Sequence, residues 1–251
     1  MKRRAKPAIL SFGPRDQGAR HEELRRMLAA CPIPDAELAR NLGTFLVPQT
    51  LSRVLFMDFL YRSALEVQGV VMEFGCRWGQ NLSLYSSLRG IYEPFNRLRK
   101  IVGFDTFAGF PAVRPKDGRR VKAGDYSTTP DYETYLEKLM VLLEAESPLP
   151  HLRKFELVKG DVTKTLPKYL KAHPSTVVAL AYFDLDIYHP TKAAIKAIGK
   201  HVTKGTVIGF DEVNDETTPG ETLALAEELG LRNVRLKRWP WSARTSYLVV
   251  E

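Results

Sequence analysis

Two pairs of acidic residues in the second half of the chain each follow an apolar run. Asp184 and Asp186 follow residues 176–183, and Asp211 and Glu212 follow residues 205–210. Runs of this kind are typical of strands buried on both faces of a parallel sheet. Because ligands of such sheets bind beyond the carboxyl ends of the strands, we expect the four carboxylates to face one crevice.

Four carboxylates in one crevice would repel one another unless a cation lay among them. Their hard oxygen atoms, with no cluster of Cys or His close in the sequence, favour Mg²⁺ over Zn²⁺ as that cation. The alternative is that these acids cap the helices that follow them or pair with Lys and Arg side chains. The presence of two such pairs on neighbouring predicted strands favours the metal site.

A second kind of site is predicted around residues 70–81. An apolar segment containing Glu73 leads through Gly75 and Gly79 to Asn81, where we expect a helix to begin. Gly75 can adopt a backbone geometry that other residues resist, and Gly79 lets a ligand or the strand approach the helix closely. The segment lacks the third glycine of the Gly-x-Gly-x-x-Gly fingerprint, which disfavours the alternative of a nicotinamide-dependent oxidoreductase.

Three acids occur in order at the ends of three successive predicted strands. Glu73 could hold an ammonium group, Asp105 is placed to accept hydrogen bonds from ribose hydroxyls, and Asp161 could meet an adenine amine. This order suits S-adenosylmethionine, whose methionine part carries an amine and which needs no phosphate cradle. A non-catalytic nucleotide-binding module would not need four converging carboxylates, so we expect an enzyme.

Strands and helices alternate along most of the chain. Helices are predicted over residues 21–30, 35–42, 51–67, 81–92, 132–146, 164–173, 190–201 and 221–229, and strands over 70–74, 101–104, 155–159, 176–183, 206–210, 234–238 and 247–250. This alternation predicts an α/β fold: a doubly wound, Rossmann-like sheet, mostly parallel with an antiparallel C-terminal hairpin. We expect a basic arm and N-terminal helices over residues 1–50 and one catalytic domain over 51–251. The polar stretch 112–130 is either an active-site lid or disordered.

Composition limits the class of protein. The 251 residues are 44% hydrophobic and 26% charged, which is ordinary for a soluble globular protein. No segment has the length of a membrane span, and the first residues lack the apolar core of a signal peptide. Cys31 and Cys76 do not make a disulfide framework, and neither has a His close in sequence. We therefore expect a cytoplasmic protein without a membrane partner, whose cysteines act as small apolar residues.

The net charge of +8 is unevenly distributed. Residues 1–26 contain eight Lys and Arg against three Asp and Glu, so this segment carries +5 and the remaining chain carries +3. A basic terminal arm is sufficient to explain the charge. No basic stripe interleaved with aromatic residues is present, so we expect no nucleic-acid partner.

Five segments of the chain carry distinctive motifs: residues 73–80, 103–111, 159–167, 183–191 and 205–212. Together they resemble the macrocin, mycinamicin and novobiocin group of antibiotic-sugar O-methyltransferases. The Asp-x-Asp-x-Tyr and Asp-Thr-Phe-x-Gly-Phe-Pro stretches are the most specific parts of this resemblance. It implies a class I methyltransferase fold, S-adenosylmethionine as the methyl donor, and Mg²⁺. Within the group, the calicheamicin type that methylates TDP-rhamnose is one candidate.

The resemblance also implies roles for individual residues. Asp184, Asp211 and Glu212 match the metal ligands, and Asp186, which forms the catalytic pair with Asp184, matches the general base. The group usually has Asp-Asp where this chain has Asp211-Glu212, so Glu212 either reaches the ion directly or binds it through water. The positions assigned to the cofactor are Glu73, Gly75, Gly79, Asn81, Asp105, Thr106 and Asp161.

The expected substrate is a deoxysugar hydroxyl, either nucleotide-linked or on a glycosylated natural product. Mg²⁺ that chelates two neighbouring hydroxyls would lower the pKa of one, and Asp186 would take its proton. A catechol-type O-methyltransferase, which also chelates a diol, is the nearest alternative. The stretch 112–130 is basic, and its cations either bind a diphosphate or belong to a solvated loop: Arg114, Lys116, Arg119, Arg120 and Lys122. We also expect a homo-oligomer, with Trp239 and Trp241 at the end of the sheet or in a subunit contact.

Overall fold

The computed structural model describes residues 16–251, and the chain divides into two compact units, Met1–Arg53 and Val54–Glu251. The first unit contains the helices α1 (Gln17–Ala29) and α2 (Asp35–Leu38) and the 3₁₀ helix η1 (Ala39–Phe45), none of which has a buried residue. Both helices predicted in this region are therefore present. The first fifteen residues of the predicted basic arm lie outside the described residues.

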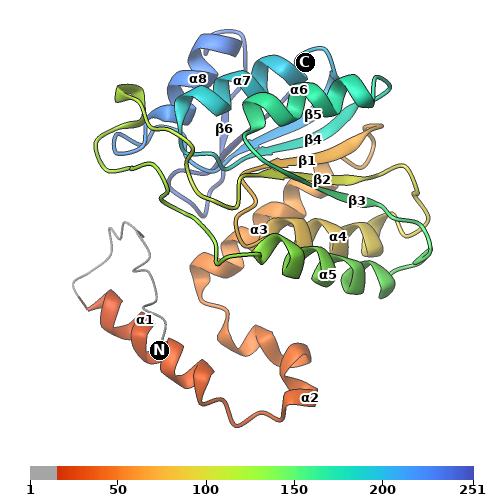
Figure 1. The fold of residues 1–251 in the computed structure, drawn as a ribbon, viewed down its shortest axis with the longest axis vertical. Helices are drawn as coiled ribbons and strands as arrows, with labels where there is room; N and C mark the ends of the chain where they lie inside the picture. The colour runs from red at the N-terminus through yellow and green to blue at the C-terminus, as the bar shows by residue number, and fades with distance from the viewer. Residues whose placement is uncertain (1–15) are drawn as a thin grey trace. The chain divides into compact units, whose positions relative to one another are not determined.

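A seven-stranded sheet with the order β3-β2-β1-β4-β5-β7-β6 organises the second unit (Figure 1). The strands are β1 (Val70–Phe74), β2 (Ile101–Asp105), β3 (Phe155–Lys159), β4 (Val178–Phe183), β5 (Val202–Phe210), β6 (Lys237–Arg238) and β7 (Ser246–Val249). Strands β1 to β5 run parallel, whereas β7 is antiparallel to both β5 and β6. The predicted sheet, with its antiparallel C-terminal hairpin, is confirmed.

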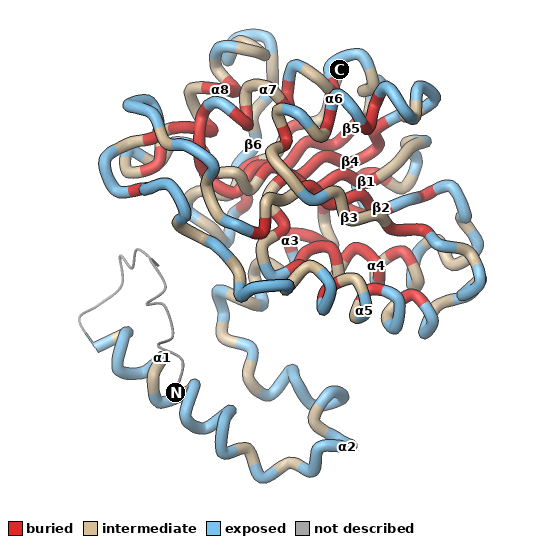
Figure 2. The backbone as a smooth tube through the Cα atoms, in the orientation of Figure 1, coloured by how far each residue is buried: buried red, intermediate tan, exposed pale blue. Residues whose placement is uncertain are grey.

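Two layers of helices cover the sheet, with α3, α4 and α5 on one face and α6, α7 and α8 on the other (Figure 1). Their bounds are α3 (Pro48–Ser63), α4 (Gln80–Tyr92), α5 (Tyr132–Ala145), α6 (Val162–Ala172), α7 (Tyr188–Ile198) and α8 (Gly220–Leu229). No helix formed by residues 16–251 combines the length and apolar character of a bilayer span. The buried backbone is concentrated in the sheet and in the helix faces that meet it (Figure 2).

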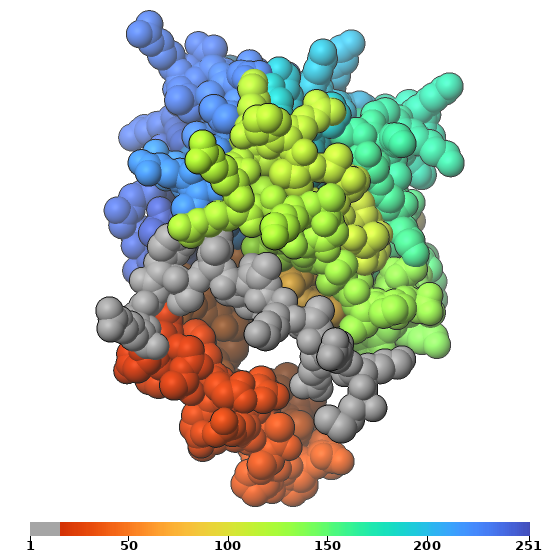
Figure 3. All heavy atoms as spheres, turned by 60° about the vertical axis from the view of Figure 1, so that its left-hand side comes forward, coloured from red at the N-terminus to blue at the C-terminus, as the bar shows by residue number. Residues whose placement is uncertain are grey.

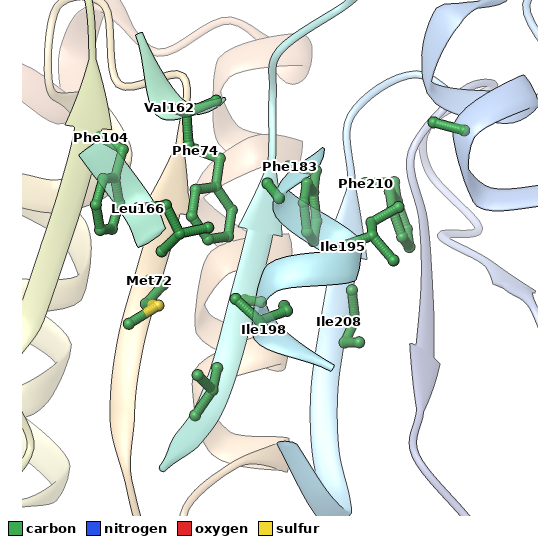
Figure 4. Close-up of a cluster of buried hydrophobic side chains, with 14 of the residues drawn as sticks. Met72, Phe74, Phe104, Val162, Leu166, Phe183, Ile195, Ile198, Ile208 and Phe210 are labelled. Carbon is green, nitrogen blue, oxygen red and sulfur yellow. The ribbon is translucent and has the colours of Figure 1, made fainter. Parts of the chain in front are cut away.

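The apolar side chains form one core on each face of the sheet. On the α6–α8 face, Leu166, Ile195 and Ile198 pack against strand residues that include Met72 and Ile208 (Figure 4). The opposite core is formed by α3, α4 and α5 and includes Met57, Leu60, Leu82, Leu136 and Met140. Because both faces are covered, the parallel strands are continuous apolar runs, as the sequence pattern predicts.

Four phenylalanines lie side by side at or next to the carboxyl ends of the central strands. Phe104, Phe74, Phe183 and Phe210 occupy paired register positions on β2, β1, β4 and β5. Their ring centroids follow one another at 5.3, 4.9 and 5.2 Å (Figure 4). This row of rings forms the end of the core on the α6–α8 face, at the edge of the sheet where the acidic residues emerge.

Three elements differ from their predicted bounds for identifiable reasons. Helix α6 begins at Val162 rather than at residue 164 because the Asp161 carboxylate accepts the Thr163 N–H and caps the helix. Helix α7 begins at Tyr188 rather than at residue 190 because a carboxylate from elsewhere in the chain, Asp117, accepts the Tyr188 N–H. Strand β5 extends back to Val202, which pairs with Val178 before a shift in register.

A buried cluster of charges joins α4 and α5 to the start of β3. Arg89 donates to the Glu144 carboxylate at 2.8 Å and to the Lys154 carbonyl at 3.0 Å. Glu144 also accepts the Lys154 backbone N–H, and the Lys154 ammonium donates to the carbonyls of Leu149 and Leu152. Removing one member of such a cluster leaves a buried charge uncompensated.

Arg89→Leu should therefore lower the free energy of unfolding by about 3 kcal/mol, because Glu144 loses its partner in a dry interior. The matched control is Arg62→Leu, which breaks the exposed ion pair with Asp58 and should cost less than about 1 kcal/mol. Urea denaturation of both variants measures the difference. Equal losses would show that the buried cluster contributes no more than a surface ion pair.

Candidate active site

The turn after β1 passes directly over the end of β4. Gly75 adopts a positive φ of 92°, and a Cβ at this position would overlap the backbone carbonyl of Asp184. Only glycine fits this crossing, so the expected special geometry of Gly75 is present. Gly79 also has a positive φ, and the close approach that it permits is to the Leu136 side chain of α5 rather than to the strand.

Glu73 and Asn81 form a buried polar pair between β1 and α4. The Asn81 Nδ2 donates to Glu73 Oε1 at 2.8 Å. The Asn81 Oδ1 is also buried and has no hydrogen-bond partner among the described residues. A buried acceptor of this kind requires a donor, and a ligand that carries an N–H group could supply one.

Asp105 at the end of β2 organises the neighbouring loops. Its two carboxylate oxygens accept the backbone N–H groups of Arg77 at 2.7 Å and Phe107 at 2.6 Å. Burial raises the pKa of Asp105, although these N–H donors oppose the shift. The Cys76 N–H also opposes the shift, and the carboxylate, which can accept about four hydrogen bonds, keeps acceptor capacity for a ligand hydroxyl.

The two remaining positions predicted to bind the cofactor have local partners. The Thr106 hydroxyl donates to the Gly109 carbonyl and accepts the Ala108 N–H, so it stabilises the turn after β2. Asp161 Oδ1 accepts both the N–H and the hydroxyl of Thr163 as the cap of α6. Cys76, in the β1 turn, is buried, and burial raises the pKa of its thiol well above the usual range, in keeping with a small apolar residue.

The four predicted carboxylates of the second site converge at the ends of β4 and β5. Asp186 is buried and has a positive φ of 59°. Burial, followed by the charges of Asp184, Glu212 and Asp211, raises the pKa of Asp186 well above its usual range. Asp211 accepts a hydrogen bond of 2.8 Å from the Tyr182 hydroxyl. Asp184, Asp211 and Glu212 therefore lie close enough to Asp186 for their charges to act on it, and their shared role stays a prediction.

Both carboxylate oxygens of Glu212 have side-chain partners. The Arg244 guanidinium donates to Oε1 and the Thr218 hydroxyl donates to Oε2. Burial raises the pKa of Glu212 despite these donors. Within residues 16–251, no group of three or more His, Cys, Asp and Glu side chains is arranged to hold a metal ion, so the Mg²⁺ site stays a prediction.

The loop between β2 and α5 supplies a residue that the sequence pattern does not single out. Tyr126 has a positive φ, and the Arg77 guanidinium lies 4.7 Å from the centroid of its ring. Burial and the charges of Asp186 and Glu212 raise the pKa of Tyr126 to about 12. The Tyr126 hydroxyl therefore lies near Asp186 and Glu212. No periodicity in the sequence indicates that Tyr126 would lie there.

The stretch 112–130 lies within the described residues and contains the 3₁₀ helix η2 (Pro115–Asp117). Asp117 is buried and accepts the Tyr188 N–H at the start of α7 at 2.6 Å. Lys116 pairs with Glu227 of α8 at 2.5 Å and lies 4.1 Å from the centroid of the Tyr188 ring. Figure 3 shows this segment, in yellow-green, against the blue atoms of the C-terminal part of the chain.

The remaining cations of this loop are exposed. Arg119, Arg120 and Lys122 have no ion pair with any residue in the described part of the chain. Lys116, by contrast, forms an ion pair with Glu227. Its charge is therefore already neutralised, unlike those of the other cations predicted to bind a diphosphate. Together with the exposed Arg114, the first three residues give the loop four cations that are available to an anionic ligand.

The two C-terminal tryptophans differ in exposure. Trp239 is buried and lies 5.1 Å from Phe56 and 5.3 Å from Phe59 of α3, measured between ring centroids. Trp241 is 64% exposed and meets Trp239 edge-on. Trp239 therefore packs in the core beside the edge of the sheet, in agreement with an end-of-sheet role.

Glu221 is a further buried carboxylate near Asp184, Asp186 and Asp211, and the sequence does not predict it as a site residue. It accepts backbone N–H groups from the segments that follow β4 and β5. Burial and the charges of Asp186 and Asp184 raise the pKa of Glu221 well above its usual range. In the sequence it is only an acid in the first turn of a helix, where the helix dipole alone would account for it.

The chain closely resembles a solved structure described as the calicheamicin methyltransferase CalS11, with 41% identity over 95% of this chain and 94% of that chain and a TM-score of 0.92. An apo structure of CalS11, described as a TDP-rhamnose 3'-O-methyltransferase of calicheamicin biosynthesis, matches at 39% identity over 96% of both chains with a TM-score of 0.84. The O-methyltransferase NovP shares the fold at 15% identity over 79% of both chains, with a TM-score of 0.60. No family model and no curated protein matches the chain.

Proposed function

The chain belongs to the family of CalS11, the S-adenosylmethionine-dependent O-methyltransferases of antibiotic sugars, and from this premise we propose that it methylates a hydroxyl of a nucleotide-linked deoxysugar. The observation that carries the proposal is 41% identity to CalS11 over nearly the whole length of both chains. A nicotinamide-dependent oxidoreductase and a non-catalytic module have no such support.

For the cofactor, the buried pair of Glu73 and Asn81 fits the ammonium group of S-adenosylmethionine. Glu73 supplies negative charge, and the Asn81 Oδ1 is an acceptor that lacks a donor among the described residues. Asp105 would accept the ribose hydroxyls through the acceptor sites that its backbone contacts leave, and Asp161 would face the adenine amine. When bound, the cofactor supplies an electrophilic methyl group on a positively charged sulfur.

For the metal, the donor set fits a hard divalent cation because it consists of carboxylates whose charges destabilise one another. Asp184 and Asp211 would hold the ion directly. Glu212 would contribute by exchanging one of its present partners, Arg244 or Thr218, or through water. When bound, the cation would lower the pKa of a coordinated sugar hydroxyl and fix its direction.

For proton transfer, Asp186 is the proposed general base. It lies in a buried position beside the other acids, from which its carboxylate would accept the proton of a hydroxyl held at the metal. Tyr126, whose ring packs on Arg77, would close the same space from the side of the loop and exclude water. The reaction then depends on orientation of the hydroxyl in line with the methyl group.

For the substrate, the exposed cations Arg119, Arg120 and Lys122 support a diphosphate-bearing sugar. The same loop carries Asp117, which accepts an N–H of α7, and Tyr126, which lies within the electrostatic influence of Asp186 and Glu212. The diphosphate would lie at the surface while the sugar enters beneath the loop. CalS11, described as acting on TDP-rhamnose, is consistent with a substrate of this class.

Binding of S-adenosylhomocysteine tests the cofactor assignment. Calorimetry should detect binding of S-adenosylhomocysteine to the protein but no binding of NAD. Glu73→Gln should weaken this binding by about 10- to 100-fold, because a charge-assisted contact is worth about 1.5–3 kcal/mol. Glu144→Gln, a change of an equally buried carboxylate outside the site, should leave the affinity nearly unchanged. Binding of NAD without any response to S-adenosylhomocysteine would exclude the assignment.

Removal of divalent cations should abolish turnover. Asp184→Asn and Asp211→Asn should each lower kcat by about 100-fold or more, because the metal contributes several kcal/mol. Calorimetric titration with Mg²⁺ gives a readout independent of activity, and each variant should lose binding. Glu212→Asp, which restores the acid pair that is usual in the related enzymes, should be tolerated. Full turnover in excess EDTA would rule out the metal.

Neutralising the loop cations tests the diphosphate assignment. The triple change of Arg119, Arg120 and Lys122 to Gln should raise KM for a nucleotide sugar by about 10-fold at low ionic strength, and the difference should shrink in high salt. The affinity for S-adenosylhomocysteine should not change, because these residues lie outside the proposed cofactor site.

The control for this change removes three exposed lysines of α6, Lys164, Lys168 and Lys171, and so alters the net charge equally. It should leave KM unchanged. A neutral glycoside provides the second comparison, since its KM should respond neither to the triple change nor to salt. If KM for the nucleotide sugar also responds neither to the triple change nor to salt, the loop is solvated and the diphosphate assignment is wrong.

A further inference from the structure

Glu221 lies at the start of α8, and its side chain is completely buried. A carboxylate in the first turn of a helix is usually explained by the N–H groups of its own helix. Glu221 instead accepts hydrogen bonds from two other segments of the chain. Each of these segments carries acids of the candidate active site.

The two oxygens of Glu221 divide their contacts between the two segments. Oε1 accepts the backbone N–H groups of Leu185 at 3.0 Å and Asp186 at 3.3 Å, in the segment after β4. Oε2 accepts the backbone N–H of Glu212 at 3.1 Å, in the segment after β5. One side chain therefore connects the backbone of the proposed base to the backbone of a proposed metal ligand.

The residue before Glu221 makes this reach possible. A Cβ on Gly220 would lie 2.5 Å from the Asp186 carbonyl oxygen and 2.6 Å from the Tyr188 nitrogen. Because glycine has no Cβ, α8 can begin in direct contact with residues 186–188. The positive φ of Asp186 is held between this contact and the hydrogen bond to its own N–H.

We propose that Glu221 is a positioning residue, which fixes both acidic segments of the active site in register with each other by accepting three of their backbone N–H groups. It neither contacts the substrate nor binds the metal in this role. The catalytic consequence rests on the proposed function, since it assumes that Asp186 and Asp211-Glu212 act on one substrate. The structural part of the proposal does not depend on it.

Glu221→Gln tests the proposal with almost no change in shape. The amide has one acceptor oxygen, and its NH₂ group cannot accept an N–H, so one of the two segments must lose its partner. Hydrogen–deuterium exchange followed by mass spectrometry should show faster exchange of the amides at 185–186 or at 212. A misplacement of about 1 Å at the reacting groups should lower kcat by about 100-fold.

Three further variants make the result specific. Glu144→Gln is the matched control, because Glu144 is also buried and also accepts a backbone N–H, but in the α4–α5–β3 cluster. It should lower the melting temperature while kcat stays within about 3-fold of the native value. Glu221→Asp keeps both acceptor oxygens on a shorter arm and should recover part of kcat. Gly220→Ala should speed exchange in the segment at 185–188 without altering the carboxylate.

Each outcome decides one part of the proposal. Unchanged exchange at 185–186 and at 212 in Glu221→Gln would overturn it. So would faster exchange with a kcat equal to that of Glu144→Gln, because the segments would then not need to be held in register. If the native protein methylates no nucleotide sugar or glycoside and exchange still rises in Glu221→Gln, the positioning contact stands and the proposed function fails.

Discussion

Acidic side chains in this protein emerge from a parallel sheet at the end of an apolar core, and the rest of the active site depends on that constraint. Phe104, Phe74, Phe183 and Phe210 occupy paired positions on the four central parallel strands. An acid directly follows three of them, and Glu73 directly precedes Phe74. Asp186, Asp211 and Glu212 are themselves buried, so repulsion among their charges is stronger than at a protein surface.

Neutral donors stabilise much of this negative charge. Backbone N–H groups approach Asp105 and Glu221, and the Tyr182 hydroxyl donates to Asp211. Arg244, which pairs with Glu212, is the cation that opposes the charge around Asp186. A site that holds its acids mainly by dipoles keeps a strongly negative potential, which suits both a cationic sulfonium cofactor and a divalent ion.

The loop between β2 and α5 contacts both the start of α7 and the turn after β1. Asp117 binds the first N–H of α7, so the loop is tied to the segment that carries Asp186. Tyr126 lies beside the same acids, while Arg77 from the turn after β1 stacks on its ring. The loop therefore connects the proposed cofactor side of the site to the carboxylate side, and its cations remain at the surface.

The sequence by itself determined the strands, their parallel arrangement and the common edge of the acids, because these follow from local apolar runs and from the geometry of parallel sheets. β1 and β3 have the predicted bounds. Only the tertiary structure decided which partner each charged group meets. Lys116 pairs with Glu227, 111 residues away, and Glu221 holds Leu185 from 36 residues away. Such pairings depend on how α8 and the loop pack on the sheet, and no local spacing encodes them.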